Sequence, residues 1–232
     1  MKFELPLQKG TLLQRYKRFL CDVELFSGEK VTAHCPNPGR MQGCSEPGSE
    51  VVISTSPNPK RKLKHTLELV KTATSWVGVN PLRANAIVEE ALIEGRIDGL
   101  EDFEALHREI AYGQNSRIDL VLQKEGTKHF IEVKSVTLAE NGTAMFPDAP
   151  TARGRKHLHE LMHIVASGNR AAMFFLVQRE DTNAFCPASH IDPHYATRLK
   201  QAVESGVDIF VYDCTVTENG IRIRNKLNWE IA

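Results

Sequence analysis

The stretch SRIDLVLQKEGTKHFIEVKSV, residues Ser116–Val136, decides how the second half of this chain folds. It contains two runs in which apolar and polar residues alternate, the pattern of a strand with one buried face. Between the runs lie Lys124, Glu125, Gly126 and Thr127, a turn-forming group with a glycine near its centre. We therefore predict a β-hairpin whose turn is centred between Glu125 and Gly126.

The register of this hairpin gathers three charged side chains on one face. Asp119 lies opposite Glu132, and Lys134 follows two residues later on the same side. Two carboxylates roughly 5 Å apart repel each other, and Mg²⁺ or Mn²⁺ would compensate them, because such ions bind carboxylates together with a substrate phosphate. Lys134 could compensate them instead, and an exposed face with all three side chains solvated is the alternative. The expected apolar pairs are Ile118 with Val133 and Leu120 with Ile131.

The composition is that of an ordinary globular protein. The 232 residues are 41% hydrophobic and 25% charged, enough for one large core or two modest ones. No apolar run approaches the roughly 20 residues of a membrane helix, and the first residues contain no apolar signal core. The five cysteines show no C-x-x-C spacing, which argues against a disulfide framework or a structural zinc site. We expect a cytoplasmic protein with no membrane partner and no small-molecule cofactor; the oligomeric state is not determined.

The charge is unevenly distributed although the net charge is zero. Residues 1–80 carry 12 Lys and Arg against 7 Asp and Glu, whereas the remainder carries 17 against 22. This division fits a basic part that contacts phosphates and an acidic part that holds cations, although chance can also produce it. The candidate DNA contacts are Arg15, Lys17, Arg18, Lys60, Arg61, Lys62 and Lys64, of which the last four also fit a solvated charge run.

Residues 1–80 are predicted to form a small antiparallel β-barrel. Turn signals such as Asn37-Pro38-Gly39 and Glu46-Pro47-Gly48 separate short β-branched runs, the usual pattern of such barrels. The expected strands are Gly10–Phe26, Lys30–Cys35, Glu50–Thr55 and Leu67–Val79.

A second domain is predicted over residues 81–232, where strands and helices alternate. Asn80 can cap a helix that begins at Pro81 and ends at Gly95, and the domain boundary is placed here. An α/β (α+β) fold with an antiparallel hairpin near its front follows from this order. Strands are expected over Leu106–Tyr112, Arg117–Gln123, Lys128–Thr137, Arg170–Gln178, Val207–Tyr212 and Gly220–Arg224, and helices over Thr151–Ser167 and Pro193–Ser205.

The charged residues of the hairpin resemble the motif of the PD-(D/E)xK nuclease superfamily, with an isoleucine in place of the proline. The resemblance implies a restriction-endonuclease-like mixed sheet flanked by helices, with Asp119 and Glu132 as metal ligands. It also implies a third ligand from the Val133 carbonyl. Lys134 would orient or activate the attacking water and stabilise charge at the phosphorus.

Many members of that superfamily add an acidic residue from the preceding helix. Glu89 and Glu90 are the candidates here, and the resemblance favours Glu90 as a further metal ligand. A glutamate on the solvated surface of the helix is an equal alternative.

Longer segments resemble the sugar fermentation stimulation protein family (SfsA) over essentially the whole chain. The resemblance implies a DNA-binding bacterial protein with an N-terminal OB-like barrel, a nuclease-like domain and an association with the regulation of sugar metabolism. A C-terminal helix-turn-helix has been ascribed to the family, but Val207–Tyr212 alternates and is β-branched, so we predict a strand there. The segments that carry the resemblance are Leu12–Leu20, His34–Met41, Ser116–Leu122, Ile131–Glu140 and Phe146–Leu161.

The helix after the hairpin brings basic residues toward the predicted metal site. Arg153 and His157 share one flank at i, i+4 spacing, with Lys156 nearby, and together they could grip a scissile phosphate. A cationic solvent face is the alternative. Asp148, in the preceding loop, would support the site from behind or only cap the turn.

His159-Glu160-Leu161-Met162-His163 also matches H-E-x-x-H, the zinc metalloprotease motif. A third ligand would have to come from His190 or His194. We thus carry three hypotheses: a DNA-binding protein with Mg²⁺- or Mn²⁺-dependent DNA endonuclease activity, a non-catalytic DNA-binding regulator on a nuclease scaffold, and, remotely, a metalloprotease.

Overall fold

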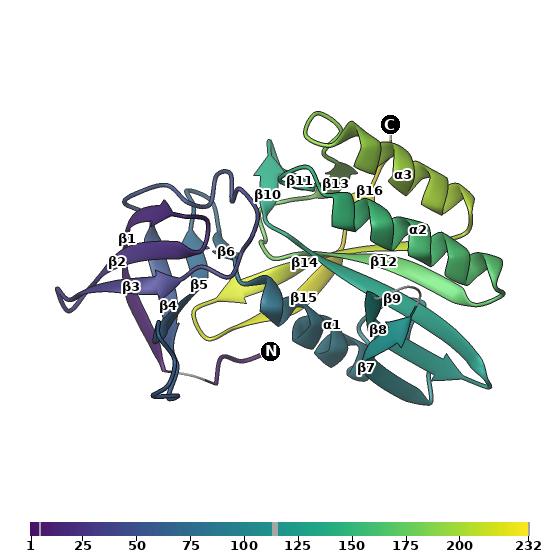
Figure 1. Ribbon diagram of the computed structural model, residues 1–232, viewed down its shortest axis with the longest axis horizontal. Coiled ribbons are helices and arrows are strands. Elements are labelled where there is room, and N and C mark those ends of the chain that lie inside the picture. The colour runs from purple at the N-terminus through teal and green to yellow at the C-terminus, as the bar shows by residue number, and fades with distance from the viewer. Residues whose placement is uncertain (5, 113–115, 232) are drawn as a thin grey trace.

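The first domain is a closed five-stranded barrel with the OB topology (Figure 1). The structure, a computed structural model, describes residues 1–4, 6–112 and 116–231. Around the barrel the order is β1-β2-β3-β5-β4, and β1 closes the ring by pairing with β4. A short β6 extends the sheet beyond β5. The strands are β1 (Leu7–Tyr16), β2 (Leu20–Leu25), β3 (Lys30–His34), β4 (Glu50–Thr55), β5 (His65–Lys71) and β6 (Trp76–Gly78).

Two of the strands predicted in this barrel are wrong in length. The predicted strand Gly10–Phe26 is divided into β1 and β2, because Lys17 and Arg18 adopt positive φ angles of 47° and 65° and reverse the chain. The predicted strand Leu67–Val79 is likewise divided, into β5 and β6. The turns between β1 and β2 and between β5 and β6 contain no strong turn signal, so the sequence pattern did not reveal them.

The helix between the domains follows its predicted capping. A turn of 3-10 helix, η1 (Pro81–Arg83), leads into α1 (Ala84–Ile93). The Asn80 side chain accepts a hydrogen bond from the Leu82 N–H at 3.1 Å, and Pro81 begins the turn.

The second domain is built on a six-stranded mixed sheet, as predicted. The order is β15-β14-β12-β9-β8-β7, in which β9, β12 and β14 run parallel and the remaining neighbours are antiparallel. Val207–Tyr212, where a helix-turn-helix was the alternative, leads into and lies largely within β14 of the hairpin of β14 and β15, so the prediction of a strand is confirmed. The elements are β7 (Ala105–Tyr112), β8 (Ser116–Lys124), β9 (Thr127–Val136), α2 (Ala152–Ala166), β12 (Arg170–Val177), α3 (Pro193–Glu204), β14 (Asp208–Thr217) and β15 (Gly220–Lys226).

A second, four-stranded sheet was not predicted. Its strands are two to four residues long, too short for an alternating pattern to reveal them. They lie in the order β10 (Leu138–Glu140), β11 (Thr143–Phe146), β13 (Ala184–Pro187) and β16 (Asn228–Trp229).

The hairpin of β8 and β9 has the predicted register over most of its length. Its ladder pairs Leu120 with Ile131, as expected, but does not continue to Asp119. Ile118 was predicted to share a face with Leu120, which is wrong: Ile118 packs in the core beneath α2, whereas Leu120 packs beneath α1. Glu109, the residue of β7 at the same level, has a φ of 51°, so both strands are irregular at this point.

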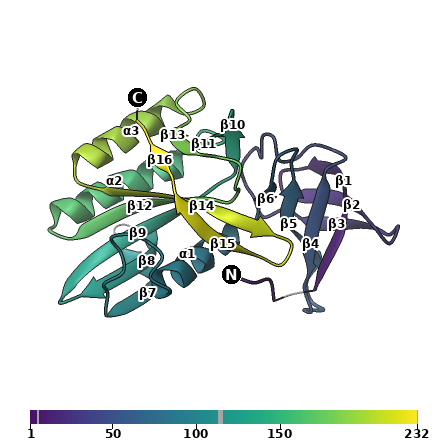
Figure 2. The same cartoon turned by 180° about the vertical axis from the view of Figure 1, so that it is seen from behind.

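Helices cover the central sheet on both faces (Figures 1 and 2). One core cluster packs under α2 and α3, and the other under α1. The cluster under α1 also contains Val52 and Leu69 of the barrel, so the two domains share one hydrophobic core. Among the described residues, no helix is long and apolar enough to span a membrane.

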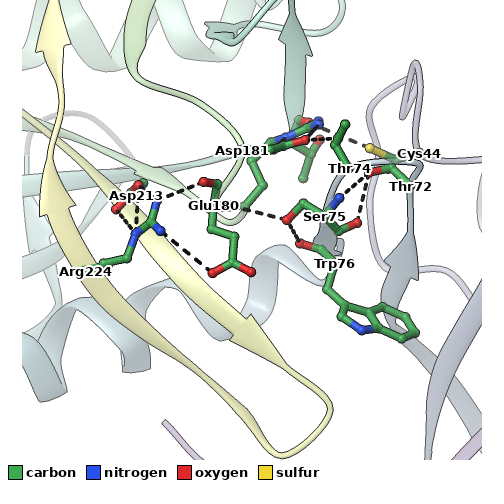
Figure 3. A network of polar contacts seen from close by, with 11 residues as sticks. Cys44, Thr72, Thr74, Ser75, Trp76, Glu180, Asp181, Asp213 and Arg224 are labelled. Carbon is green, nitrogen blue, oxygen red and sulfur yellow. Dashed lines mark hydrogen bonds and ion pairs between the residues drawn. The ribbon is translucent and has the colours of Figure 1, made fainter.

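Polar contacts reinforce this shared core, as Figure 3 shows. Ser75 accepts a hydrogen bond from the Glu180 N–H at 3.4 Å, and the Thr74 hydroxyl donates to Asp181. Arg224 donates to the Glu180 carbonyl at 2.8 Å. The loop after β5 is therefore fastened to the loop after β12, which fixes the barrel against the sheet domain.

Candidate metal centre

A cleft of about 550 Å³ lies where the two domains meet, and the charged residues of the hairpin line it. The barrel contributes residues 37–39, and η1 and the start of α1 form another wall. The end of β11, the loop of residues 147–151 and the first two turns of α2 complete it. Asp119, Glu132, Val133 and Lys134 all line this cleft, so the fold brings the predicted catalytic and metal-binding residues together.

Asp119 is held at the point where β8 separates from β9. One of its carboxylate oxygens accepts a hydrogen bond from the Val133 N–H at 2.8 Å, and the other accepts one from the Asn85 amide at 2.9 Å. The carboxylate thus takes the place of a ladder partner, which fixes its position on β9.

Glu132 is only 2% exposed, and its two carboxylate oxygens differ. Oε1 accepts a hydrogen bond from Lys134 Nζ at 2.6 Å and lies against Nδ1 of His157. Oε2 is buried and has no hydrogen-bond partner among the residues that the structure describes. A buried carboxylate oxygen without a partner is costly, so this atom marks a place for a bound cation or donor.

The two carboxyl groups have opposite shifts in pKa. Burial, and then the charge of Glu132, raises the pKa of Asp119, and hydrogen bonds from Val133 and Asn85 offset this only partly. Burial alone would raise the pKa of Glu132, but Lys134 and His157 outweigh it and lower that pKa. A second positive charge at Asp119 would relieve the repulsion that remains.

His157 lines the cleft but holds neighbouring side chains in position, and a contact between His157 and phosphate stays a prediction. Its ring is buried, and Nε2 accepts a hydrogen bond from Arg153 Nε at 3.2 Å. This assigns the proton to Nδ1, which donates to Glu132. Both ring nitrogens are therefore used to hold Glu132 and Arg153 in position.

The other two residues of α2 that were predicted to contact phosphate lie in different places. Arg153 lines the cleft, where its guanidinium can approach a phosphate. Lys156 does not line it; the side chain pairs with Glu160 at 3.5 Å and borders a different cavity. The prediction that Lys156 contacts the scissile phosphate is therefore not supported by its position.

The acidic residue expected from the preceding helix is absent from the site. Glu90 pairs with the amino group of Met1, and Glu89 pairs with Arg108 at 3.1 Å. Neither glutamate lines the cleft, so the choice of Glu90 as a metal ligand is wrong. Asn85, one turn earlier, faces Asp119 instead. The signal that could have found it is a lone amide in the first turn of an otherwise apolar helix face.

Two carboxylates, those of Asp119 and Glu132, are the candidate ligands for a metal ion. No group of three or more His, Cys, Asp or Glu side chains gathers around one point in the described part of the chain. Mg²⁺ and Mn²⁺ do not need such a group, because they bind one or two carboxylates and complete their shell with water and substrate phosphate. The donor set of Asp119 and Glu132, with the unpaired Oε2, fits an ion of this kind.

The predicted DNA contacts of the barrel divide into two groups. Lys17 and Arg18 are exposed at the turn between β1 and β2, beside the exposed ring of Phe19. Lys60, Lys62 and Lys64 are exposed in the loop between β4 and β5, where Arg61 donates to the Thr66 hydroxyl at 2.6 Å.

Arg15 has a structural role in the barrel. Its guanidinium donates to three backbone carbonyls, those of Asn37, Gly39 and Arg40, at 2.8–3.1 Å. These bonds use three of its five N–H donors, and its Nε is buried. The guanidinium therefore holds the barrel loop, and a contact between Arg15 and DNA stays a prediction.

The H-E-x-x-H motif does not form a zinc site. The rings of His159 and His163 lie 4.4 Å apart on an exposed face of α2, beside a cavity distinct from the cleft. Neither His190 nor His194 joins them, and no third ligand is present among the described residues. These residues therefore do not form a metalloprotease site.

Comparison with known proteins agrees with this two-domain architecture. Residues 13–79 match the model of the SfsA N-terminal OB domain, and residues 82–220 match that of the sugar fermentation stimulation protein RE domain. The chain belongs to the sugar fermentation stimulation protein family. A homolog from Geotalea uraniireducens is 49% identical over 98% of this chain and 99% of its own length. A homolog from Geobacter sulfurreducens is 50% identical, covering 96% of this chain and 95% of its own.

A solved structure shares the whole fold. Pyrococcus furiosus SfsA, solved in complex with Ca²⁺, is 27% identical and superimposes with a TM-score of 0.85 over 100% of this chain and 98% of that one. The barrel and the sheet domain are thus arranged alike in this chain and in the Pyrococcus furiosus relative.

Proposed function

We propose that this protein is a DNA-binding phosphodiesterase that cleaves DNA with Mg²⁺ or Mn²⁺. The observation that carries the proposal is the buried, unpaired Oε2 of Glu132, which lies in the same cleft as Asp119 and Lys134. A scaffold retained only for DNA binding has no physical need to bury two carboxylates in a cleft with one oxygen unsatisfied.

Asp119 and Glu132 would hold the metal ion, with the Val133 carbonyl as a further candidate ligand. When bound, the ion would supply Lewis-acid chemistry at the phosphate. The Pyrococcus furiosus relative was solved with Ca²⁺, a hard cation that prefers the same oxygen donors. This supports a divalent-cation site in the family fold.

The remaining residues position and neutralise charge. Lys134 is held by Glu132 and lies near Nδ1 of His157 at 3.1 Å, from where its ammonium can stabilise charge that develops at the phosphorus. Arg153 offers a second cationic group at the wall of the cleft. In the hydrolysis, the oxygen of water bonds to phosphorus while the bond to the leaving sugar oxygen breaks, and the proton of the water passes to that oxygen.

DNA binding by the barrel is supported by the position of its basic residues. OB folds bind oligonucleotides through the loops β1–β2 and β4–β5. In this chain those two loops carry Lys17, Arg18, Lys60, Lys62 and Lys64, all exposed. Because phosphate contacts release counterions, affinity should fall steeply as salt rises.

The test is incubation of the purified protein with single-stranded, duplex and branched DNA, with Mg²⁺, Mn²⁺ or EDTA. We expect cleavage that requires metal and disappears in Glu132→Gln, which keeps the shape of the side chain. The control is Glu140→Gln, an exposed glutamate on β10 that does not line the cleft. Cleavage unchanged in Glu132→Gln would contradict the assignment of the site. Binding without cleavage of any substrate would instead identify a non-catalytic DNA-binding regulator.

A further inference from the structure

A loop of the barrel forms one wall of the metal-site cleft, and a residue of the sheet domain fastens it there. We name residues 37–41 the latch loop. Its Met41 N–H donates to Asp148 Oδ2 at 3.0 Å. Gly39 lies so close to the same carboxylate that a β-carbon at this position would overlap it. The latch loop and the loop before α2 are therefore in direct contact beside Asp119 and Glu132.

The latch loop is also held from the barrel side. Arg15 donates to three of its carbonyls, and the Asn37 side chain accepts a hydrogen bond from the Gly39 N–H at 2.8 Å. A loop with charge-assisted bonds on one side and a carboxylate on the other has few ways to move aside. The wall that it forms is thus a fixed part of the cleft.

The cleft cannot widen by rotation of the barrel without breaking buried contacts. Gly78 donates its N–H to the Gln178 carbonyl at 2.8 Å across the domain boundary. Any β-carbon at Gly78 would come within 2.6 Å of the Gln178 side chain, so the backbones are packed directly together. Val52 and Leu69 bury their side chains in the core under α1. A hinge here would expose apolar surface.

The size of the cleft then limits what can reach the metal site. About 550 Å³ is the size of pockets that hold one small molecule, roughly 300–1,000 Å³, and would take one or two nucleotides. An intact duplex presents two backbones across grooves roughly 12 Å and 6 Å wide, and the second strand would meet the latch loop.

We propose that the cleft takes a single DNA strand and excludes the continuous duplex, with the latch loop as the selecting element. The inference rests on the proposed function. It adds the substrate class: single-stranded DNA or an unpaired flap.

Another wall of the cleft carries a side chain suited to such a strand. Leu82 is 75% exposed and lines the cleft from η1. An exposed leucine beside a nucleic-acid site can pack against an unstacked base or act as an apolar wedge between bases. Within a duplex the base faces are stacked and offer no such contact.

The first experiment compares substrates without ends. The protein is incubated with Mn²⁺ and either a single-stranded circle or a covalently closed, relaxed duplex circle of the same sequence, and the initial rates of strand cleavage are measured. We expect the single-stranded circle to be cut at least about tenfold faster. Equal rates would overturn this inference and leave the proposed function standing. Cleavage of neither circle, nor of linear single strands, would contradict the proposed function itself.

The second experiment uses substitutions. Leu82→Ala should slow cleavage of the single-stranded circle by about fivefold, the scale of losing one base contact. Ile93→Ala is the matched control, because Ile93 is 67% exposed on the same helical segment but outside the cleft. Asp148→Ala, which releases the latch loop, should reduce the preference for single strands at least threefold. Equal effects of Leu82→Ala and Ile93→Ala, or an unchanged preference in a folded Asp148→Ala protein, would overturn the proposal.

Discussion

Two glutamates, one in the barrel and one in the sheet domain, are buried to the same degree but differ in their hydrogen-bond partners. Glu68 on β5 is 1% exposed and accepts hydrogen bonds from Ser54 at 2.7 Å, from Asn80 at 2.8 Å and from Arg83 at 2.7 and 3.1 Å. Both of its oxygens are occupied by the protein. Glu132, at 2% exposed, has one oxygen occupied and one without a partner among the described residues.

The difference shows that burial of a carboxylate does not identify a functional site. Glu68 fastens the barrel to the start of η1, and its charge is compensated by Arg83. Glu132 retains unused acceptor capacity in a cleft, next to a second carboxylate that repels it. The unused capacity, together with access to a cleft, is what distinguishes a binding carboxylate from a structural one.

The largest effect should come from Asp119→Asn, which tests whether the carboxylate beside Glu132 is needed for cleavage. We expect cleavage to fall by about 10²–10³-fold, the usual loss when one group that stabilises the transition state is removed. Because the pKa of Asp119 is raised in the folded protein, its ionised form destabilises the fold at neutral pH. The variant should therefore be at least as stable as the wild type in urea unfolding. A large loss of stability would show that Asp119 is structural.

Glu68→Gln should show the opposite pattern. Removing one member of a buried ion pair leaves Arg83 without its partner, and we expect a loss of about 2–3 kcal/mol in the free energy of unfolding, reduced because Arg83 is about one third exposed. Cleavage per folded molecule should stay within about twofold of the wild type. Loss of activity in a fully folded Glu68→Gln protein would remove the contrast between the two glutamates.

His129 sharpens the criterion. Nε2 of this buried residue forms no hydrogen bond among the described residues and lies 3.5 Å from Asp208 Oδ2, and His129 does not line the cleft of Asp119 and Glu132. Burial, and then Arg170, lowers its pKa from 6.5 to about 4, with Asp208 opposing the shift. The unfolded chain therefore binds the proton first, and stability is lost as the pH falls from about 6.5 toward 4.

Urea unfolding at pH 7.5 and pH 5 measures this effect. We expect the wild type to lose about 2 kcal/mol more than His129→Phe over this interval, which is the linkage for the two pKa values. His129→Phe should retain cleavage. Loss of cleavage would mean that a buried atom without a hydrogen bond can mark function even where its residue does not line the cleft.

The smallest expected effect is stabilisation by the metal ion. A ligand at ten times its dissociation constant stabilises the folded state by about 1.4 kcal/mol, and for a chain of this size that raises the melting temperature by about 3–6 °C. Mn²⁺ should produce this shift in the wild type and in Glu68→Gln but not in Glu132→Gln. A shift of equal size in Glu132→Gln would place the ion elsewhere.

The hairpin and its three charged residues could be predicted from sequence because strand alternation is a local property. The ladder from Leu120 with Ile131 to the turn follows that prediction. The departure at Asp119 could not be predicted, because there its carboxylate accepts hydrogen bonds from Val133 on β9 and from Asn85 on α1. Such contacts between separate elements leave no mark in the alternation of a single strand.

Errors in the site have the same origin. Whether Glu90 or Asn85 faces the site depends on how α1 is rotated about its axis over the sheet. The apolar pattern of α1 does not define this rotation narrowly enough to decide between them. The structural bonds of Arg15 could not be predicted, because a cation in a basic segment carries no sign of its partners. Its carbonyl acceptors lie more than twenty residues away in the chain.

The hydrophobic core that runs from the barrel into the sheet domain has a consequence for how this molecule folds. Val52 and Leu69 pack with the apolar residues of α1, although the barrel also has a core cluster of its own. A fragment that ends near residue 80 would expose Val52 and Leu69 to water, and the complementary fragment would expose the face of α1 that covers them. We therefore expect the two domains to be coupled in unfolding, with the barrel less stable as an isolated fragment than in the whole chain.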